Sequence, residues 1–251
     1  MAVKLHERIR RWNTYLRVGA ISAAFLLLAV TGVAMVIFGG DDGDGDAGAG
    51  ETTTTTMATG GIEVAAPEGW RAIPLPQFGL GLAVPDEWEA TVLTGDALAS
   101  LSSASPLVPG FVDAAHAAAQ AEAVFYAAGV DGEGRITDLK VRADLDTGVT
   151  DVAGLEPYAA GLAQASGAVS PVVSVVEGAA LPTVDVRYTV EVERPVDGGE
   201  EGETERLTVQ GTDRLVLGPD GVVYSLVVTS ELPAPDHDAF TTRVFATLTF
   251  P

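Results

Sequence analysis

The sequence predicts an α+β fold in which an antiparallel β-sheet is sandwiched by helices, behind an N-terminal transmembrane helix and a disordered linker. Three observations carry this prediction. Residues 18–38 form an unbroken apolar run. Residues 183–193 alternate apolar and polar side chains, which is typical of a strand with one buried face. Residues 109–121 and 155–166 have the composition and length of helices. The predicted parts are a cytoplasmic basic tail (1–17), a transmembrane helix (18–38), an acidic linker rich in glycine and threonine (39–68) and an extracytoplasmic domain (69–251).

The apolar run has the length and the flanking charge of a membrane anchor. At about 1.5 Å per helical residue it matches the ~30 Å hydrocarbon core of a bilayer. Basic side chains precede it and acidic side chains follow it, and basic flanks remain in the cytoplasm. The bases are Lys4, Arg8, Arg10, Arg11 and Arg17, and the acids are Asp41, Asp42, Asp44, Asp46 and Glu51. We therefore expect a single-pass protein of the cell membrane, with the lipid bilayer as a partner and the main domain outside.

A cleaved export signal is the alternative to a retained anchor. Signal sequences have apolar regions of about 7–15 residues that end close to a small-x-small cleavage site. This run is longer and ends in the bulky residues Met35, Val36, Ile37 and Phe38, which favours retention. The chain contains no cysteine, which excludes lipid-modified lipoproteins, disulfides, thiolate metal sites and cysteine nucleophiles. The inner tail is too short to fold as a signalling module.

Composition restricts the partners of the chain. Its formal net charge is −21, and an acidic surface repels phosphate backbones, so we expect no nucleic-acid partner. Lys4 and Lys140 are the only lysines, whereas alanine, glycine, valine and arginine are abundant. This bias predicts a GC-rich bacterial source, of actinobacterial type.

The linker is predicted from its glycines and acids. Residues 39–61 present little apolar surface, and their acids repel one another, so the segment should be disordered. The run Thr52–Thr56 is either O-glycosylated or an unmodified spacer, and the sequence leaves both open.

The rest of the chain contains signals for seven strands and three helices. Pro109 and Pro157 suit the first turns of two of the helices. Val184, Val186, Tyr188, Val190 and Val192 should face the core, and the residues between them should face solvent. The predicted strands are 78–84, 89–93, 122–129, 136–143, 183–193, 205–217 and 222–230, and the predicted helices are 109–121, 155–166 and 236–248.

One segment and the order of the last elements resemble a known superfamily. In residues 78–88 (FGLGLAVPDEW) a strand ends in Pro85, with Trp88 three residues further on, and the hairpin 205–230 is followed by helix 236–248. This arrangement resembles the Mog1/PsbP-like superfamily over about residues 70–251. The resemblance implies an antiparallel sheet between helices that acts as a binding or accessory domain without catalysis. The chain departs from the actinobacterial envelope lipoproteins of that superfamily because it lacks their lipidated cysteine.

The candidate catalytic residues are Asp113 and His116, which are three residues apart on a predicted helix. A hydrolase would also need a nucleophile, and the nearest in sequence are Ser102, Ser103 and Ser105, without a Gly-x-Ser-x-Gly elbow. A surface pair is the favoured interpretation of the two residues. An envelope hydrolase using Asp113 and His116 is kept as the alternative.

No other segment predicts a catalytic, cofactor or metal site. At Asp236, His237 and Asp238 the acids are explained by capping and by the helix dipole, and the distant outer histidines make no zinc site. Residues 131–134 form a turn, and residues 197–203 form a solvated acidic hairpin tip that could bind calcium or a basic partner weakly.

Trp70 and Trp88 belong either to the core or to an exposed platform for a glycan or peptide. With no catalytic constellation visible, the sequence predicts a membrane-anchored, non-enzymatic binding or accessory protein of the cell envelope. Its partner would be an envelope protein or a small ligand.

Overall fold

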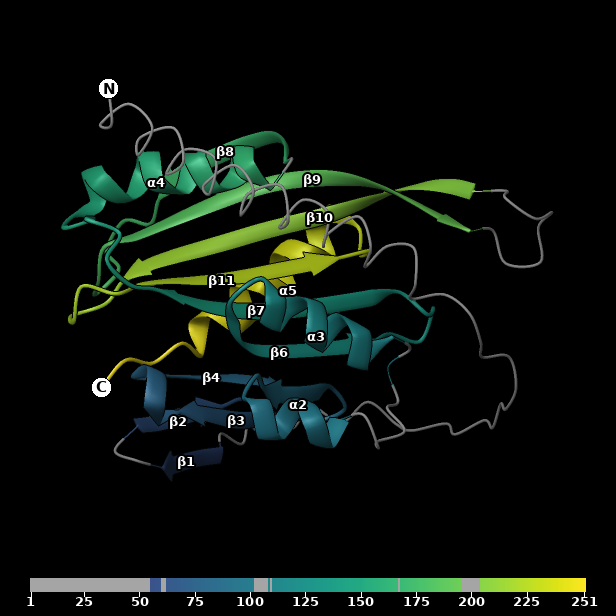
Figure 1. Cartoon of the computed structure of the whole chain (residues 1–251), viewed down its shortest axis with the longest axis horizontal. Helices are drawn as coiled ribbons and strands as arrows, with labels where there is room; N and C mark the ends of the chain where they lie inside the picture. Colours follow the sequence, from purple (N-terminus) through teal and green to yellow (C-terminus); the bar gives the residue numbers. More distant parts are fainter. Residues whose placement is uncertain (1–54, 60–61, 102–107, 109, 167, 196–203) are drawn as a thin grey trace, which may run out of the picture. The chain divides into compact units, whose positions relative to one another are not determined.

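The computed structural model describes residues 55–59, 62–101, 108, 110–166, 168–195 and 204–251 (Figure 1). The predicted tail, the transmembrane helix and the linker up to residue 54 lie outside these residues. Within the described part of the chain, no helix is long and apolar enough to cross a membrane. The described residues form two compact units, one of residues 89–237 and one of residues 55–88 with 238–251.

The fold is α+β, with antiparallel sheets and helices. The strands are β1 (Thr55–Thr59), β2 (Ile62–Ala66), β3 (Trp70–Leu75), β4 (Leu80–Pro85), β5 (Glu89–Val92), β6 (Ala123–Val130), β7 (Ile136–Asp144), β8 (Val169–Val175), β9 (Thr183–Pro195), β10 (Thr204–Leu217) and β11 (Val223–Ser230). The helices are the 3-10 turn η1 (Pro76–Phe78) and α2 (Gly95–Leu101), α3 (Phe111–Gln120), α4 (Val152–Ala165) and α5 (Ala234–Ala246).

The larger unit is built on a seven-stranded sheet in the order β5-β6-β7-β11-β10-β9-β8 (Figure 1). Every neighbouring pair of strands in this sheet is antiparallel. Hairpin connections explain part of the order, because β6–β7, β8–β9, β9–β10 and β10–β11 are consecutive along the chain. Strand β11 pairs with β7, and this pairing joins strands β5-β6-β7 to strands β11-β10-β9-β8 in one sheet.

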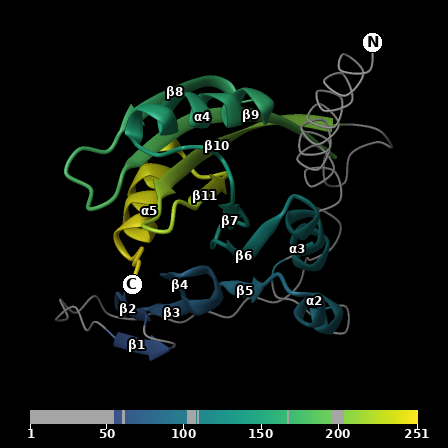
Figure 2. The same cartoon turned by 60° about the vertical axis from the view of Figure 1, so that its left-hand side comes forward.

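One face of this sheet carries both α3 and α4, and we call it the pocket face (Figure 2). Helix α3 packs on β6, and helix α4 packs on β8, β9 and β10. Pairing places Tyr126, Lys140, Val227, Asp213 and Val186 in one row across β6, β7, β11, β10 and β9. Tyr126 contacts the cluster around α3, and Val186 contacts the cluster around α4, so both helices cover the same face.

Local sequence explains why α4 begins where it does. Asp151 is its N-cap, in extended conformation, and its side chain accepts a hydrogen bond from the Gly154 amide at 2.9 Å. The buried residues Leu155, Ala159 and Ala163 are spaced by four, so that one stripe of the helix enters the core. On the opposite face of the sheet, the first turn of α5 places His237 against β10 and β11.

The smaller unit contains two antiparallel pairs, β1–β2 and β3–β4, together with the second part of α5. Strand β2 alternates buried and exposed residues and packs on β3 and β4. Phe240 stacks on Trp70 and Trp88, with ring centroids 5.7 and 5.0 Å away. The Ala83 amide donates to Thr247 Oγ1 at 2.9 Å. Both tryptophans are therefore core residues, which decides between the two interpretations of the sequence.

Most of the predicted elements are present with boundaries shifted by a few residues. Helices α3, α4 and α5 and strands β4, β5, β6, β7, β9, β10 and β11 overlap the predicted ranges. Elements β1, β2, β3, α2 and β8 are not among those predicted. Pro157 lies inside α4 rather than in its first turn, because capping by Asp151 starts the helix at Val152.

Three further expectations are corrected. The folded region begins before residue 69, since Ile62, Val64 and Ala66 are buried within the range assigned to the linker. Asp236 does not cap α5, because the helix already begins at Ala234. Asp185 does not face solvent, because it is buried and paired with Arg214.

Candidate ligand-binding pocket

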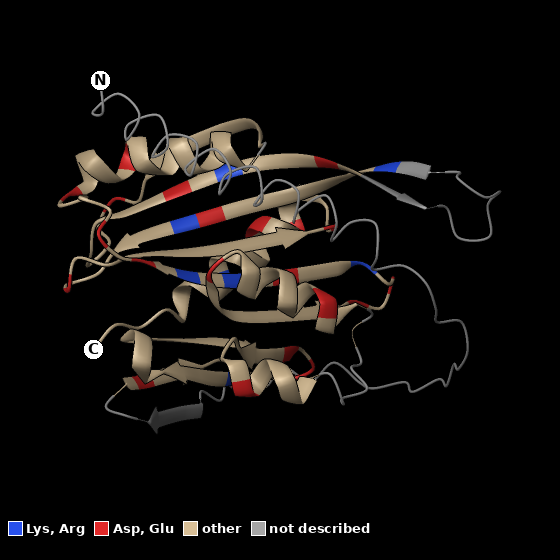
Figure 3. Ribbon diagram, viewed as in Figure 1, with Lys and Arg blue, Asp and Glu red and all other residues tan. Residues whose placement is uncertain are grey.

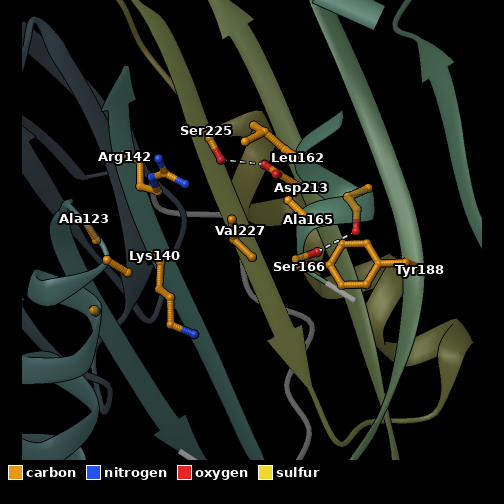
Figure 4. A pocket seen from close by; sticks show the side chains of 13 residues that line it. Ala123, Lys140, Arg142, Leu162, Ala165, Ser166, Tyr188, Asp213, Ser225 and Val227 are labelled. Atoms are coloured by element: carbon orange, nitrogen blue, oxygen red, sulfur yellow. Dashed lines mark hydrogen bonds between the residues drawn. The ribbon is translucent and has the colours of Figure 1, made fainter. Parts of the chain in front are cut away.

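A pocket of about 80 Å³ lies on the pocket face of the seven-stranded sheet, between α3 and α4 (Figure 4). Its base comes from strands β7, β11, β10 and β9, and its walls come from the ends of the two helices. The lining residues are Ala118, Ala121, Ala123, Lys140, Arg142, Leu162, Ala163, Ala165, Ser166, Tyr188, Asp213, Ser225 and Val227.

The walls are apolar because both helices end in small or aliphatic residues at this point. Ala118 and Ala121 lie at the end of α3, and Leu162, Ala163 and Ala165 lie at the end of α4. Alanine side chains leave the space that larger residues would fill. The C-terminal ends of both helices are directed to the same place, and a helix C-terminus carries partial negative charge.

The aromatic side of the pocket depends on a close approach between two strands. Tyr188 on β9 is paired with Gly211 on β10, and its ring lies against that glycine. A Cβ atom at position 211 would lie only 2.3–2.8 Å from three atoms of the ring. Gly211 therefore allows the ring to lie across β10 and to line the pocket. Burial, together with the charges of Asp213 and Asp138, raises the pKa of the Tyr188 hydroxyl.

Strand β7 contributes two cations to the base of the pocket, and each is paired with an acid of the same strand. Figure 3 shows the basic positions in blue and the acidic positions in red along this strand. Lys140 Nζ lies 3.0 Å from Asp138 Oδ1, and Arg142 Nη2 lies 3.0 Å from Asp144 Oδ1. In both pairs the acid is two residues away on the same strand, and hence on the same face.

Other side chains hold these two acids in place. The Thr229 hydroxyl donates to Asp138 Oδ1 at 2.8 Å, and the Tyr158 hydroxyl donates to Asp144 Oδ2 at 2.9 Å. Arg142 Nε is buried and has no hydrogen-bond partner, so its guanidinium is not fully satisfied by Asp144.

Asp213 is the exceptional charged residue of the pocket. It is 9% exposed, and it accepts one hydrogen bond, from the Ser225 hydroxyl at 2.8 Å. Within the described residues it has no ion-pair partner. Burial raises the pKa of Asp213 to about 6, although the Ser225 hydrogen bond and the charge of Arg142 act in the opposite direction. A carboxyl group in this state is often part of a functional site.

The residues proposed for a hydrolase do not converge on this pocket. Asp113 is exposed and His116 is half-buried on α3, no hydrogen bond joins them, and neither lines the pocket. Ser102, Ser103 and Ser105 lie outside the described residues.

His237 is buried, and its ring nitrogens lie 2.9 Å from Thr212 Oγ1 and 3.2 Å from Ser230 Oγ. These contacts give it a structural role between β10, β11 and α5. Nowhere in the described part of the chain do three or more acidic or histidine side chains come together to hold a metal ion.

Two acidic loops were predicted from the sequence, at residues 131–134 and 197–203. Residues 131–134 form the predicted turn, in which Asp131 Oδ1 accepts from the backbone amides of Glu133 and Arg135, both at 2.9 Å. The acidic segment 197–203 lies outside the described residues.

The pocket itself was not predicted from the sequence. Charged and apolar residues alternate along β7, which is the pattern expected of a strand with one face in solvent. The charged residues are Asp138, Lys140, Arg142 and Asp144. One sequence feature could have indicated the pocket. Asp213 is a charged residue inside the long strand β10, between segments that favour β-structure. Only the pairing of strands shows that these charges share one enclosed face.

Comparisons with known proteins find similarity to solved structures and none to a family model or curated protein. The solution structure of the PsbP protein CyanoP from Synechocystis sp. PCC 6803 is similar to 73% of this chain and 93% of its own, with 8% sequence identity and a TM-score of 0.41. A likeness at this level does not assign a function, and membership of the Mog1/PsbP-like superfamily stays a prediction.

Proposed function

We propose that the chain is a non-enzymatic binding or accessory protein of the cell envelope, of Mog1/PsbP-like type, with its ligand site in the pocket between α3 and α4. The observation that carries the proposal is the combination of apolar walls with an unpaired carboxyl group, Asp213, at the base. Ligand pockets typically combine apolar walls with a few polar groups that orient the ligand.

The lining of the pocket favours binding over catalysis. Ser225 is only 1% exposed and donates its hydroxyl proton to Asp213, and the other lining hydroxyl, that of Ser166, donates to the Ala163 carbonyl and not to a base. No histidine lines the pocket, and Asp113 and His116 are not part of it. The arrangement therefore lacks an accessible nucleophile beside a base, which a hydrolase needs.

The apolar run 18–38 supports the second half of the proposal, namely that this domain is tethered outside the membrane with its N-terminus in the cytoplasm. The absence of cysteine makes this orientation testable, because a single introduced cysteine is the only thiol of the chain. Ala2→Cys marks the inner tail, and Ala153→Cys marks an exposed position on α4.

We expect a membrane-impermeant maleimide to label Ala153→Cys in intact cells and to label Ala2→Cys only after permeabilisation. The reverse pattern would overturn the proposed orientation. Labelled protein in the soluble fraction, cut after residue 38, would replace the anchor with a cleaved signal.

Ligand binding is tested by filling the pocket. Ala121→Phe places a large side chain on the pocket wall, and Ala153→Phe makes the same change at an exposed position outside it. The full chain and both variants are purified from membranes, and the small molecules bound to them are extracted and identified by mass spectrometry. We expect compounds that the parent chain and Ala153→Phe retain and that Ala121→Phe has lost. Identical extracts from all three proteins would overturn the pocket as the binding site.

A further inference from the structure

We propose that this pocket selects small organic cations, in particular a primary ammonium group on a short apolar chain, with Asp213 as the counter-ion. The inference rests on the proposed function of the pocket and adds the chemical class of its ligand. It follows from the distribution of charge and of unused hydrogen-bonding capacity among the lining residues.

The charges at the base of the pocket leave one acid uncompensated. Lys140 is paired with Asp138, and Arg142 is paired with Asp144, so each pair is neutral as a whole. Asp213 is bound only by the neutral Ser225 hydroxyl. Burial of an unpaired carboxylate is costly, and a cation that enters beside it removes this cost.

The surroundings of Asp213 also favour positive charge. The last turns of α3 and α4 end at the pocket, and both contribute the partial negative charge of a helix C-terminus. The ring of Tyr188 lines the same space, and aromatic faces attract cations. The local fields of two helix ends, one ring and one carboxylate therefore have the same sign.

The pocket offers hydrogen-bond acceptors that suit an ammonium group. One carboxylate oxygen of Asp213 accepts from Ser225, and its other oxygen has no partner among the described residues. The Tyr188 hydroxyl likewise has no hydrogen-bond partner among the described residues. An ammonium group has three donors and no acceptor, so it can donate to both oxygens without leaving an acceptor of its own unsatisfied.

An anion would meet a different balance. Arg142 Nε is a buried donor without a partner, and it is the strongest feature that an anion could use. A carboxylate ligand there would compete with Asp144 for the guanidinium and would lie near Asp213. Like charges in one enclosed site are destabilising, and this disfavours the anion.

The volume of the pocket limits the length of the hydrocarbon chain that a ligand can carry. A dry cavity of about 150 Å³ in another protein holds benzene, and the present pocket measures about 80 Å³. A chain of about four carbons is therefore a suitable probe. Three compounds with the same chain separate the possibilities: n-butylammonium, n-butanol and butyrate.

The test is calorimetric titration of the full chain with each compound at pH 7.5, in detergent, with matched detergent in both solutions. We expect n-butylammonium to bind and the other two compounds to bind at least tenfold more weakly. Asp213→Asn should lower the affinity for the amine at least tenfold, and Ala121→Phe should abolish binding. Tyr188→Phe, which keeps the ring and removes only the hydroxyl, should weaken binding a few-fold.

The pH dependence provides a readout that a structural role of Asp213 would not give. Because burial raises the pKa of Asp213 to about 6, only about a tenth of this carboxyl is ionised at pH 5. Arg142 lowers that pKa, whereas Asp144 and Asp185 raise it. We expect amine binding to weaken about tenfold between pH 7.5 and pH 5 in the parent chain, and to stay constant in Asp213→Asn.

Each remaining outcome overturns a stated part. Binding of butanol or butyrate in preference to the amine, if Ala121→Phe abolishes it, would overturn cation selectivity and leave the pocket as a ligand site. Amine binding that Asp213→Asn does not change would overturn the role of Asp213. Absence of binding by all three compounds would overturn the inference, and the extraction experiment then decides whether the pocket binds another class of ligand.

Discussion

Asp185 and Asp213 are two buried acids on neighbouring strands of the same sheet, and they differ in how they are satisfied. Both are 9% exposed. Asp185 lies opposite Arg214 in the register of β9 and β10, and the guanidinium binds it through two hydrogen bonds of 2.7 and 2.8 Å. Asp213 directly precedes Arg214 on β10, so it points to the opposite face, the pocket face, where its only hydrogen-bond partner is Ser225.

The difference separates a structural acid from one held available for a ligand. The bidentate pair between Arg214 and Asp185 uses both carboxylate oxygens and fixes the register of β9 against β10. Asp213 retains an unused oxygen beside an apolar pocket, at a cost in stability that its own surroundings do not offset. Sites that bind ligands commonly carry such a cost.

The largest expected effect on stability comes from removing the arginine that pairs with Asp185. Arg214→Met keeps the length of the side chain and removes its charge, which leaves Asp185 buried without its partner. Removing one partner of a buried pair typically costs about 3–5 kcal/mol. We expect the free energy of unfolding of the full chain to fall by roughly this amount, measured by chemical denaturation with far-ultraviolet circular dichroism.

The control is the double variant Asp185→Asn/Arg214→Met, which removes both charges of the pair. It should recover much of the lost stability, because an amide is less costly to bury than an unpaired carboxylate. If the double variant is as unstable as Arg214→Met alone, the effect lies in the packing of the arginine side chain and not in the pairing of Asp185.

Removing the charge of Asp213 should change the free energy of unfolding in the opposite direction and stabilise the chain at neutral pH. The folded chain binds the Asp213 proton more tightly than the unfolded chain, because burial raises its pKa from 3.8 to about 6. The free energy of unfolding should therefore decrease as the pH rises from about 4 to about 6. Asp213→Asn removes this pH-dependent loss of stability. It should therefore stabilise the chain at pH 7.5 by at most about 3 kcal/mol, with no gain at pH 3.5.

Denaturation of both proteins across pH 3.5–7.5 measures this difference. Asp185→Asn is the matched substitution on the other face, and it should destabilise the chain at pH 7.5, because it removes the charge that Arg214 binds. Equal effects of the two substitutions at pH 7.5 would contradict the distinction between the two acids.

The contrast also shows how far the sequence predicts the molecule. The period-two pattern of residues 183–193 places Val184, Val186 and Tyr188 in the core, and the structure confirms this. The same pattern predicts that Asp185 faces solvent, and this is wrong. Alternation identifies the two faces of a strand, but it does not show whether the second face is covered or whether a neighbouring strand supplies an opposite charge.

The pocket could not be predicted for a similar reason. Lys140, Tyr188 and Asp213 lie on three strands, β7, β9 and β10, and they are separated along the chain by 48 and 25 residues. Only strand pairing brings them to the same face of the sheet. Strands β1 and β2 were missed because threonine and glycine around them favour a linker. Burial of Ile62 and Val64 against β4, where a Cβ at Gly81 would lie 2.3 Å from Val64, is a tertiary effect.

The smallest effect tests how the Tyr188 ring is placed beside Asp213. Gly211→Ala introduces a Cβ atom 2.3–2.8 Å from the ring, which must move away. Overpacking of this kind typically costs about 1–3 kcal/mol, and we expect a loss near the lower end because one side of the ring borders the pocket. Unfolding measurements give the loss, and amine titration should show weaker binding.

Two comparisons isolate the contact between the ring and the glycine. Gly161→Ala lies on an exposed part of α4 where a Cβ would meet nothing within 4 Å, so it should stabilise the chain by about 0.5–1 kcal/mol. In a Tyr188→Ala background the ring is absent, and Gly211→Ala should then cost nothing. If the cost persists without the ring, then Gly211 is required by the backbone of β10, and the position of Tyr188 in the pocket does not depend on it.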